Sequence, residues 1–586
     1  MSSTFFGLNI GTTGLYTYQA GLNTTAHNIA NAETEGYTRQ IVNQKAGNAI
    51  KVNSAYGMAG AGVDVTGVTQ ERNEYYDLKY WKNNTLSNEY STKQDYMTEI
   101  ENYFNEIELE GFTTSFNSLN NSLQELANDP SNLSVRTQVT NYSKSLTEYF
   151  NFLSTSMKSI QEESNFEVKN QVDQINSIGK QLATLTKQIN ILESGGGVAN
   201  DLRDQRALLV DDLSGIANIS VSEKVVGAGV GITSYTVKIN GQTLVDTNNF
   251  NILEVVPRSE KVNQNDVEGL YDIVWGNGQN FEMGSERLGG TLQALFEVRD
   301  GNNGENLKGK VTGEIDDTTV TLENISIDEI EKLNIPSPGI ITIGNHEYKY
   351  KSFTATYVAT TQKYTDYVFQ LDGKLIADAN NETATIGDSV NYKGIPYYMS
   401  QMNEFVRTFA KSFNDIHKTG EDLNGDAGID FFNGTDIVTG ENVLDKPSGY
   451  YGLTAANFTV TDAIYTDPSL IAAATNIANG VEDNSVLDAL IALKSDKDMF
   501  KQGTPASFLQ TLVVEIGIDT GKSASFSKSQ GDILKMIDNQ RLSISGVDVD
   551  EETMNLIRFQ NAYNLSAKVI SIMNEIYDKL INGMGV

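Results

Sequence analysis

Apolar residues recur every seven positions in the first thirty residues of the chain. The row consists of Leu8, Leu15, Leu22 and Ile29, with small residues such as Gly11 between its members. This spacing predicts a helix with one narrow apolar seam. Short isolated helices are marginal in water, so this seam needs a partner to be stable.

The last forty residues carry a stronger version of the pattern, with two apolar rows three residues apart. One row contains Val549, Leu556, Tyr563, Ile570 and Tyr577, and the other contains Phe559, Ser566, Met573 and Leu580. Two such rows form the a and d positions of a coiled-coil seam. Asp550, Glu551 and Glu552 mark the start of the helix, where acidic side chains complement the helix dipole. Either each seam supplies the partner that the other lacks, or each packs on a globular core.

Long helical blocks and strand-like blocks follow one another between the two ends. Helices are predicted over 72–108, 168–192 and 402–416 from apolar residues at helical spacing. From about 219 to 392, β-branched and aromatic residues alternate instead. In one example, the alternating run from Tyr235 to Ile239 precedes Asn240-Gly241, which predicts a hairpin.

The predicted fold is α+β and multidomain, with β-rich central domains inserted into a long helical coiled coil or bundle that the N- and C-terminal segments form. Turn-rich sequence at 301–304 (GNNG) and 392–398 (YKGIPYY) marks the two ends of an insertion. The units expected are a terminal coiled-coil domain (1–48 with 540–586), a mainly helical body (49–218 with 393–539), a β-rich domain (219–300) and an inserted β-rich outer domain (301–392).

Composition removes several classes of function. The 586 residues include 43 basic and 76 acidic side chains, for a net charge of −33. This charge disfavours nucleic acid and anionic membrane surfaces as partners. The absence of cysteine excludes disulfides, thiolate nucleophiles and cysteine-ligated metals. No run of 18 apolar residues predicts a membrane span, and the first basic residue is Arg39, so no Sec signal peptide is expected.

Motifs for catalysis are incomplete. The string GIDTGKS at 517–523 has one residue too few for a phosphate-binding loop, and an ordinary loop before a helix is expected there. His346-Glu347 lacks the second histidine of a zinc-protease helix. The other histidines, His27 and His417, lie in different predicted helices. We therefore expect no catalytic residue, no cofactor and no metal site.

One acidic loop offers a weaker metal hypothesis. Oxygen-bearing residues alternate from Asp422 to Asp430, which would place several oxygens near one calcium ion. The EF-hand pattern fails because its sixth position is Ala427 and its twelfth is Asn433. A solvated acidic loop is the simpler interpretation, and these residues leave calcium binding open.

Residues 27–40 read HNIANAETEGYTRQ, which resembles the segment after the first helix in axial proteins of the bacterial flagellum, NNIANxxTxGY. The matching residues are Asn28, Ile29, Ala30, Asn31, Thr34, Gly36 and Tyr37, whereas Glu33 stands where the family commonly has Asn. The segment SISGVDVDEETMNLIRFQNAYNLSAKVISIMNEI, from Ser543, resembles the terminal helix of the same family. DLRDQRALLVDDLS (201–214), GGTLQALFEVRD (289–300) and NGDAGIDFF (424–432) resemble its hook-associated branch, and 301–392 looks like an insertion.

The resemblance implies a non-enzymatic structural subunit at the junction of hook and filament, located outside the cell after type III export. It implies four kinds of partner: the hook protein, the second junction protein, a dedicated export chaperone and, on assembly, further copies of a chain that is monomeric in solution. The residues expected to carry assembly are Leu8, Leu15, Leu22, Ile29, Asn28, Asn31, Gly36, Tyr37, Leu556, Phe559, Tyr563, Ile570, Met573 and Tyr577.

Two alternatives remain at this stage. Another axial protein, such as flagellin or the second junction protein, would share the terminal seams. A secreted hydrolase would instead carry its catalytic groups in residues 301–392, where carboxylates are frequent but form no recognisable constellation. The number of subunits per ring and the contacts of the insertion are not encoded in any pattern of the sequence.

Overall fold

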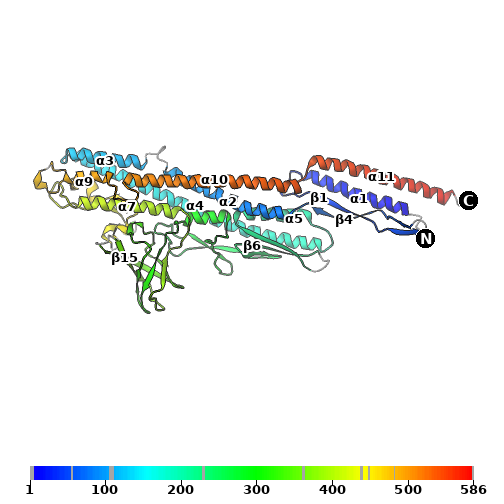
Figure 1. The fold of residues 1–586 in the computed structure, drawn as a ribbon, viewed down its shortest axis with the longest axis horizontal. Helices are drawn as coiled ribbons and strands as arrows, with labels where there is room; N and C mark the ends of the chain where they lie inside the picture. The colour runs from blue at the N-terminus through cyan, green and yellow to red at the C-terminus, as the bar shows by residue number, and fades with distance from the viewer. Residues whose placement is uncertain are drawn as a thin grey trace.

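The computed structural model describes residues 6–53, 57–104, 111–226, 231–358, 363–435, 440–446, 449–480 and 482–583. The molecule is elongated, with the two chain ends at one tip and a β-barrel projecting sideways near the other (Figure 1). The predicted α+β multidomain fold is confirmed. Within the described residues, no helix has the length and hydropathy that a bilayer crossing requires.

Long helices parallel to the molecular axis form the body (Figure 1). They are α2 (Glu74–Phe104), α3 (Phe112–Asn128), α4 (Leu133–Glu193), α7 (Ile395–His417) and α10 (Pro505–Ser545). The helices predicted over 72–108, 168–192 and 402–416 are confirmed, except that 105–108 lie outside the described residues. The loop expected at GIDTGKS is wrong, because these residues lie inside α10.

Aromatic packing fills the core at the end of the body away from the chain termini. Phe405 of α7 stacks on Phe150 of α4, with ring centroids 5.2 Å apart, and also stacks on Phe500. These rings join a large apolar cluster with residues of α3 and α10. The cluster also contacts the short elements of this end, which are β17 (Phe432–Gly434), β18 (Phe458–Val460), α8 (Asp462–Thr466) and α9 (Ser485–Ala492).

A second core lies where the middle β-strands cover α4. The four-stranded sheet contains β5 (Ile219–Val225), β6 (Thr233–Ile239), β7 (Gln242–Asp246) and β8 (Asn249–Phe250), and β9 (Leu253–Pro257) pairs with β10 (Tyr271–Trp275). The Asn240-Gly241 hairpin is confirmed, with φ of 49° and 79° at its two turn residues. Helices α5 (Asn200–Ile216) and α6 (Gly290–Asp300) complete this layer.

The barrel closes six antiparallel strands in the order β11-β12-β15-β14-β13-β16. They are β11 (Leu307–Thr312), β12 (Thr319–Glu323), β13 (Gly339–Ile343), β14 (His346–Val358), β15 (Lys363–Leu371) and β16 (Thr383–Ile386). The chain enters and leaves the barrel at adjacent points, because Asn303 N donates to Tyr392 O at 2.8 Å and Gly394 N donates to Gly301 O at 3.1 Å. The division of the chain into four domains stays a prediction.

The terminal helices α1 (Phe6–Ala30) and α11 (Val549–Asn582) lie side by side beyond the body (Figure 1). Next to them, β1 (Gln40–Ala46) pairs with β4 (Val63–Gln70), and β2 (Ile50–Asn53) pairs with β3 (Gly57–Ala59). No residue of α1 or α11 belongs to any of the three apolar cores that the described residues form.

Candidate assembly site

Helix α1 makes its contacts through small residues. Residues 6–30 contain no Asp, Glu, Lys or Arg. The side of α1 that is buried consists of Gly11, Gly14, Thr17, Gly21, Thr25 and Asn28. Small side chains let two helix backbones approach closely, so α1 is built to receive larger side chains from a partner helix.

Helix α11 supplies those side chains in antiparallel orientation. A Cβ placed on Gly7 would lie 2.7 Å from Met573 Sδ, and one placed on Gly21 would lie 2.9 Å from Phe559 Cδ1. Between these ends, Gly11 faces Ile570 in the same way. Met573, Ile570 and Phe559 therefore occupy the space that a Cβ atom would fill at these three glycines.

The contact row of α1 differs from the predicted leucine seam. The row that meets α11 is Gly7, Gly14, Gly21 and Asn28, each one residue before its predicted counterpart. The predicted residues Leu8, Leu15, Leu22 and Ile29 are half-buried and flank this row. On α11, the six predicted residues Leu556, Phe559, Tyr563, Ile570, Met573 and Tyr577 are all half-buried.

Asn28 is the best-connected residue of the flagellar motif. Its Nδ2 donates to Gln40 O at 2.9 Å and to Glu552 Oε2 at 3.2 Å. Its Oδ1 accepts from Gln40 N at 3.0 Å and from Tyr37 Oη at 2.8 Å. Asn28 is 1% exposed, and its side chain bonds three residues, Tyr37 and Gln40 after α1 and Glu552 of α11. An asparagine is therefore required here by hydrogen-bond chemistry.

The rest of the motif shapes the turn that follows α1. Asn31 Nδ2 donates to His27 O at 3.0 Å at the end of the helix. Gly36 has φ of +75°, a left-handed conformation that glycine adopts without strain. Burial, with Asp201, Asp204 and Glu552 nearby, raises the pKa of Tyr37, so its hydroxyl stays a donor to Asn28.

Arg39 ties this turn to the start of α11. Its Nε donates to Glu552 Oε1 at 2.9 Å, and its guanidinium also pairs with Glu551 at 2.7 Å and Glu71 at 3.2 Å. Burial lowers the pKa of Arg39, but Glu551 and Glu552 outweigh that effect and raise it overall. Glu552 is 2% exposed, so a residue that the sequence assigned to the helix dipole also forms a buried ion pair.

Helix α5 holds the other side of the turn. Asp204 Oδ2 accepts from Thr38 N at 3.1 Å, and Asp201 Oδ1 accepts from Gln40 Nε2 at 2.7 Å. Burial raises the pKa of Asp204 to about 6. Farther along α5, Asp211 pairs with Arg541 near the end of α10 at 2.7 Å. The motif turn is thus the joint between the terminal helices and the body.

Sequence reasoning missed Arg39, Asp204, Glu552 and Arg541 as members of this joint. One feature of the sequence could have drawn attention to Arg39, because it is the first basic residue of the chain. Glu552 carried none, because the acidic trio at the start of α11 gives no sign of which member faces α1. Its burial depends on the antiparallel register, which only the structure supplies.

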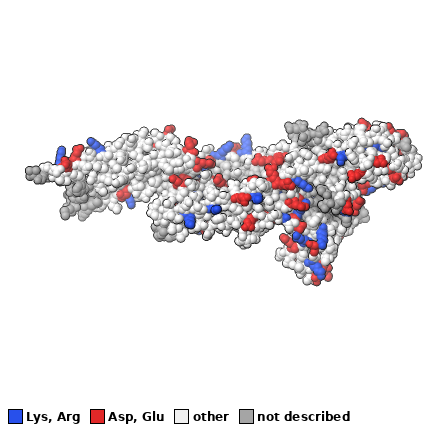
Figure 2. All heavy atoms as spheres, turned by 180° about the vertical axis from the view of Figure 1, so that it is seen from behind, with Lys and Arg blue, Asp and Glu red and all other residues white. Residues whose placement is uncertain are grey.

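The outer side of α11 exposes an apolar stripe. Leu565 is 68% exposed, and Ile572 and Ile576 continue the stripe at helical spacing. Over Val549–Asn582, the only buried residue is Glu552. Figure 2 shows few charged side chains along the terminal helices on the face it draws, and more over the body and barrel.

In the loop that raised the calcium hypothesis, the carboxylates of Asp422 and Asp430 already bond to other groups of the chain. Asp422 Oδ1 accepts from Asn424 N at 2.7 Å and from Asp426 N at 3.0 Å, while Asp430 pairs with Lys418 at 2.7 Å. In the part of the chain that the structure describes, no group of three or more acidic or histidine side chains is placed to hold a metal ion.

Comparison with known protein families identifies the family of the chain. The family model described as "Flagellar hook-associated protein FlgK helical domain" matches residues 97–334 and 342–432, more than half of the chain. The chain belongs to the FlgK family. The resemblance of the motif to flagellar axial proteins is thereby confirmed. Models of flagellar rod proteins match both ends, at 8–38 for "Flagella basal body rod protein" and at 538–583 for "Flagellar basal body rod FlgEFG protein C-terminal".

Named relatives in the FlgK family match over their whole length. The flagellar hook-associated protein 1 of Bacillus subtilis is 29% identical over 600 residues, covering 100% of this chain and 99% of the relative. That of Escherichia coli is 28% identical, covering 98% and 99%. The solved hook junction protein FlgK of Burkholderia pseudomallei aligns with a TM-score of 0.47 at 15% identity, covering 80% of this chain and 100% of that one. The FlgK family consists of structural proteins of the flagellum, so the chain is a flagellar protein.

Proposed function

We propose that the chain is a structural subunit at the junction of hook and filament and that its terminal helix pair carries the assembly. The observation that supports this most strongly is the exposure of α11, a helix of 34 residues whose only buried residue is Glu552. A helix with so little burial gains its stability from a further surface. Neighbouring subunits that cover the outer stripe of Leu565, Ile572 and Ile576 supply that surface.

The predicted assembly residues divide into two roles in this proposal. Asn28, Asn31, Gly36 and Tyr37 set the angle at which the helix pair leaves the body. Asn28 bonds Glu552 of α11 and Gly36 lies against Leu208 of α5, while Asn31 and Tyr37 hold the turn through His27 and Asn28. The half-buried apolar residues of α1 and α11 join the pair within one subunit. The outer stripe then meets the next subunit through a heterologous contact, which can repeat around a tube.

The same proposal covers partners and export. Hook protein on one side and the second junction protein on the other are the expected neighbours, with further copies of this chain within the ring. We also propose a dedicated export chaperone, a monomer before assembly, and passage through the flagellar type III channel. Rod-family matches at both ends support contact with other axial proteins through the terminal helices.

The experiment is complementation of a strain that lacks its own copy of the gene. Leu565→Asp should leave the melting curve of the purified monomer unchanged, since the side chain is 68% exposed. It should also abolish filament attachment and release flagellin into the medium, because assembly would bury an unpaired carboxylate. Gln560→Asp, at an exposed polar position of the same helix, is the matched control. Normal filaments with Leu565→Asp would refute the proposal.

A further inference from the structure

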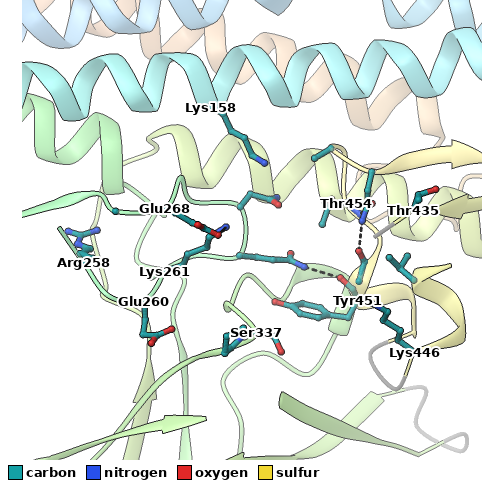
Figure 3. Close-up of a pocket in the computed structure, with 18 of the residues that line it drawn as sticks. Lys158, Arg258, Glu260, Lys261, Glu268, Ser337, Thr435, Lys446, Tyr451 and Thr454 are labelled. Carbon is teal, nitrogen blue, oxygen red and sulfur yellow. Dashed lines mark hydrogen bonds and ion pairs between the residues drawn. The ribbon is translucent and has the colours of Figure 1, made fainter. Parts of the chain in front are cut away.

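A polar cleft of about 790 Å³ lies between the body and the base of the barrel, far from the terminal helices. Lys158 points into it from α4, and the segment 258–269 lines one side (Figure 3). Ser337-Pro338 of the barrel, together with Thr435, Tyr451 and Thr454, line the rest. Its volume lies in the range of small-ligand sites.

The acidic residues of the cleft are already occupied or directed outward. Glu260 accepts from Lys349 Nζ at 2.8 Å. Glu268 has a side chain 89% exposed and lies 3.7 Å from Lys261. The Arg258 guanidinium is committed to Asp272 and Asp300, at 2.7 and 3.0 Å.

Lys158 differs from these groups. Among the described residues, no carboxylate lies within ion-pair distance of its ammonium, although the side chain is half-buried. Burial, together with the neighbouring Lys261, lowers the pKa of Lys158 against the opposing effect of Glu162. A desolvated cation beside a second cation, in a chain of net charge −33, attracts an anion.

A buried amide adds a neutral donor to the same cleft. Asn265 is 8% exposed and lines the wall, and its side chain makes no hydrogen bond to any other described residue. Its amide therefore remains available to donate to a ligand oxygen in the cleft. A cation and a hydrogen-bond donor in one cleft are the two kinds of group that bind a carboxylate.

We propose that this cleft is a carboxylate-binding site in which Lys158 supplies the charge and Asn265 supplies a hydrogen bond. The carboxylate is either a free organic acid or an acidic side chain of a neighbouring subunit, since both present the same group. The site is independent of the proposed assembly through the terminal helices, because it is complete in a single chain.

The test measures the melting temperature of the full-length monomer in glutarate against sodium chloride of equal ionic strength. Glutarate should raise the melting temperature along a saturating curve, as a ligand of the native state does. Lys158→Gln and Asn265→Ala should each weaken the half-saturation point at least tenfold. Lys187→Gln, at an exposed position of the same helix, should leave it unchanged. Equal responses of wild type and Lys158→Gln, or no response of wild type, would overturn the site.

Two further readouts separate binding from structure and identify the source. Without glutarate, Lys158→Gln should melt at the same temperature as the wild type or higher, because it removes a half-buried, unpaired charge. A lower melting temperature would mean that Lys158 stabilises the fold and would overturn the proposal. Carbodiimide treatment of isolated hook–filament junctions should join Lys158 Nζ to a carboxylate of another subunit if that subunit is the source. A glutarate response without this amide bond assigns the site to a free acid.

Discussion

Asn28 shows how one side chain can hold three segments in register. The sequence identified it through the motif, but its role depends on Gln40 and Glu552, which are distant in the chain or unremarkable in pattern. Motif matching therefore located the residue, and hydrogen-bond geometry explains it. Glu552, by contrast, lies outside the motif, and no local pattern indicates its burial.

Asn28→Asp should loosen the joint of the terminal helices. The change replaces a donor with a carboxylate that faces Gln40 O and Glu552 Oε2, and an unpaired buried charge costs about 3 kcal/mol or more. We expect faster hydrogen exchange in residues 28–40 and 549–556. Asn23→Asp, at an exposed position of α1, should change neither segment. Unchanged exchange in the Asn28 variant would show that the joint does not depend on this amide.

Glu404 gives a pH-dependent prediction within the body. Burial raises its pKa to about 7, with Lys332 opposing and Glu329 adding to the shift. The folded protein then binds a proton that the unfolded chain has lost between about pH 4.5 and 7, so stability falls as pH rises through this window. Glu404→Gln should reduce that fall, measured as denaturation midpoints at pH 5 and pH 8. The exposed Glu125→Gln is the control, and equal pH slopes for both variants would contradict the prediction.

The terminal helices show what periodicity predicts and what it leaves out. On α11 the two heptad rows contain the residues that approach α1, because large apolar side chains must face the partner. On α1 the leucine row flanks the contact, since glycines one residue earlier allow closer packing. An apolar count favours leucine over glycine, so it indicates the flanking row and does not reveal the glycine row. In α10, likewise, the turn-like GIDTGKS is overridden by packing of the helix along α2.

Substitution at Gly21 tests the close packing of α1 on α11, because a larger side chain should separate the two helices instead of stabilising α1. In an exposed helix, replacing Gly by Leu usually stabilises by up to about 1 kcal/mol. Here the new side chain would meet Phe559, so Gly21→Leu should separate α1 from α11. The chain has no cysteine, so spin labels at Gln19→Cys and Gln560→Cys can report the separation. Ala30→Leu, at an exposed position, should leave the distance distribution unchanged, and an unchanged distribution for Gly21→Leu would refute the packing.

At the scale of the whole molecule, the alternation of helical and strand-like blocks predicted the α+β architecture but not how the barrel is attached. Besides its adjoining ends, the barrel contacts the body through Arg407 of α7. The Nη1 atom of this buried guanidinium donates to Glu331 O at 2.9 Å and to Leu333 O at 3.0 Å. Such long-range contacts leave no signal in a single sequence, because each partner carbonyl belongs to the backbone.

Replacing residues 303–391 with a short Gly/Ser bridge should give a folded protein that still supports filament growth, at reduced stability. Arg407 would lose two acceptors while keeping Leu453 O and Tyr451 O. Arg407→Leu should therefore destabilise the intact protein by about 3 kcal/mol or more and the deletion variant by clearly less. Denaturation midpoints of the four proteins give the coupling. Additive effects would mean that Arg407 does not couple the barrel to the body.

The central claim is that the terminal helices are weakly held in the monomer and become stable on assembly. Hydrogen exchange of the monomer and of assembled junctions tests it most directly. In the monomer, amides of 549–582 should exchange quickly while those of 168–192 stay protected, and assembly should slow the former group at least a hundredfold. Equal and strong protection of 549–582 in both states would show that the helix pair is completed within one chain, and it would contradict the claim.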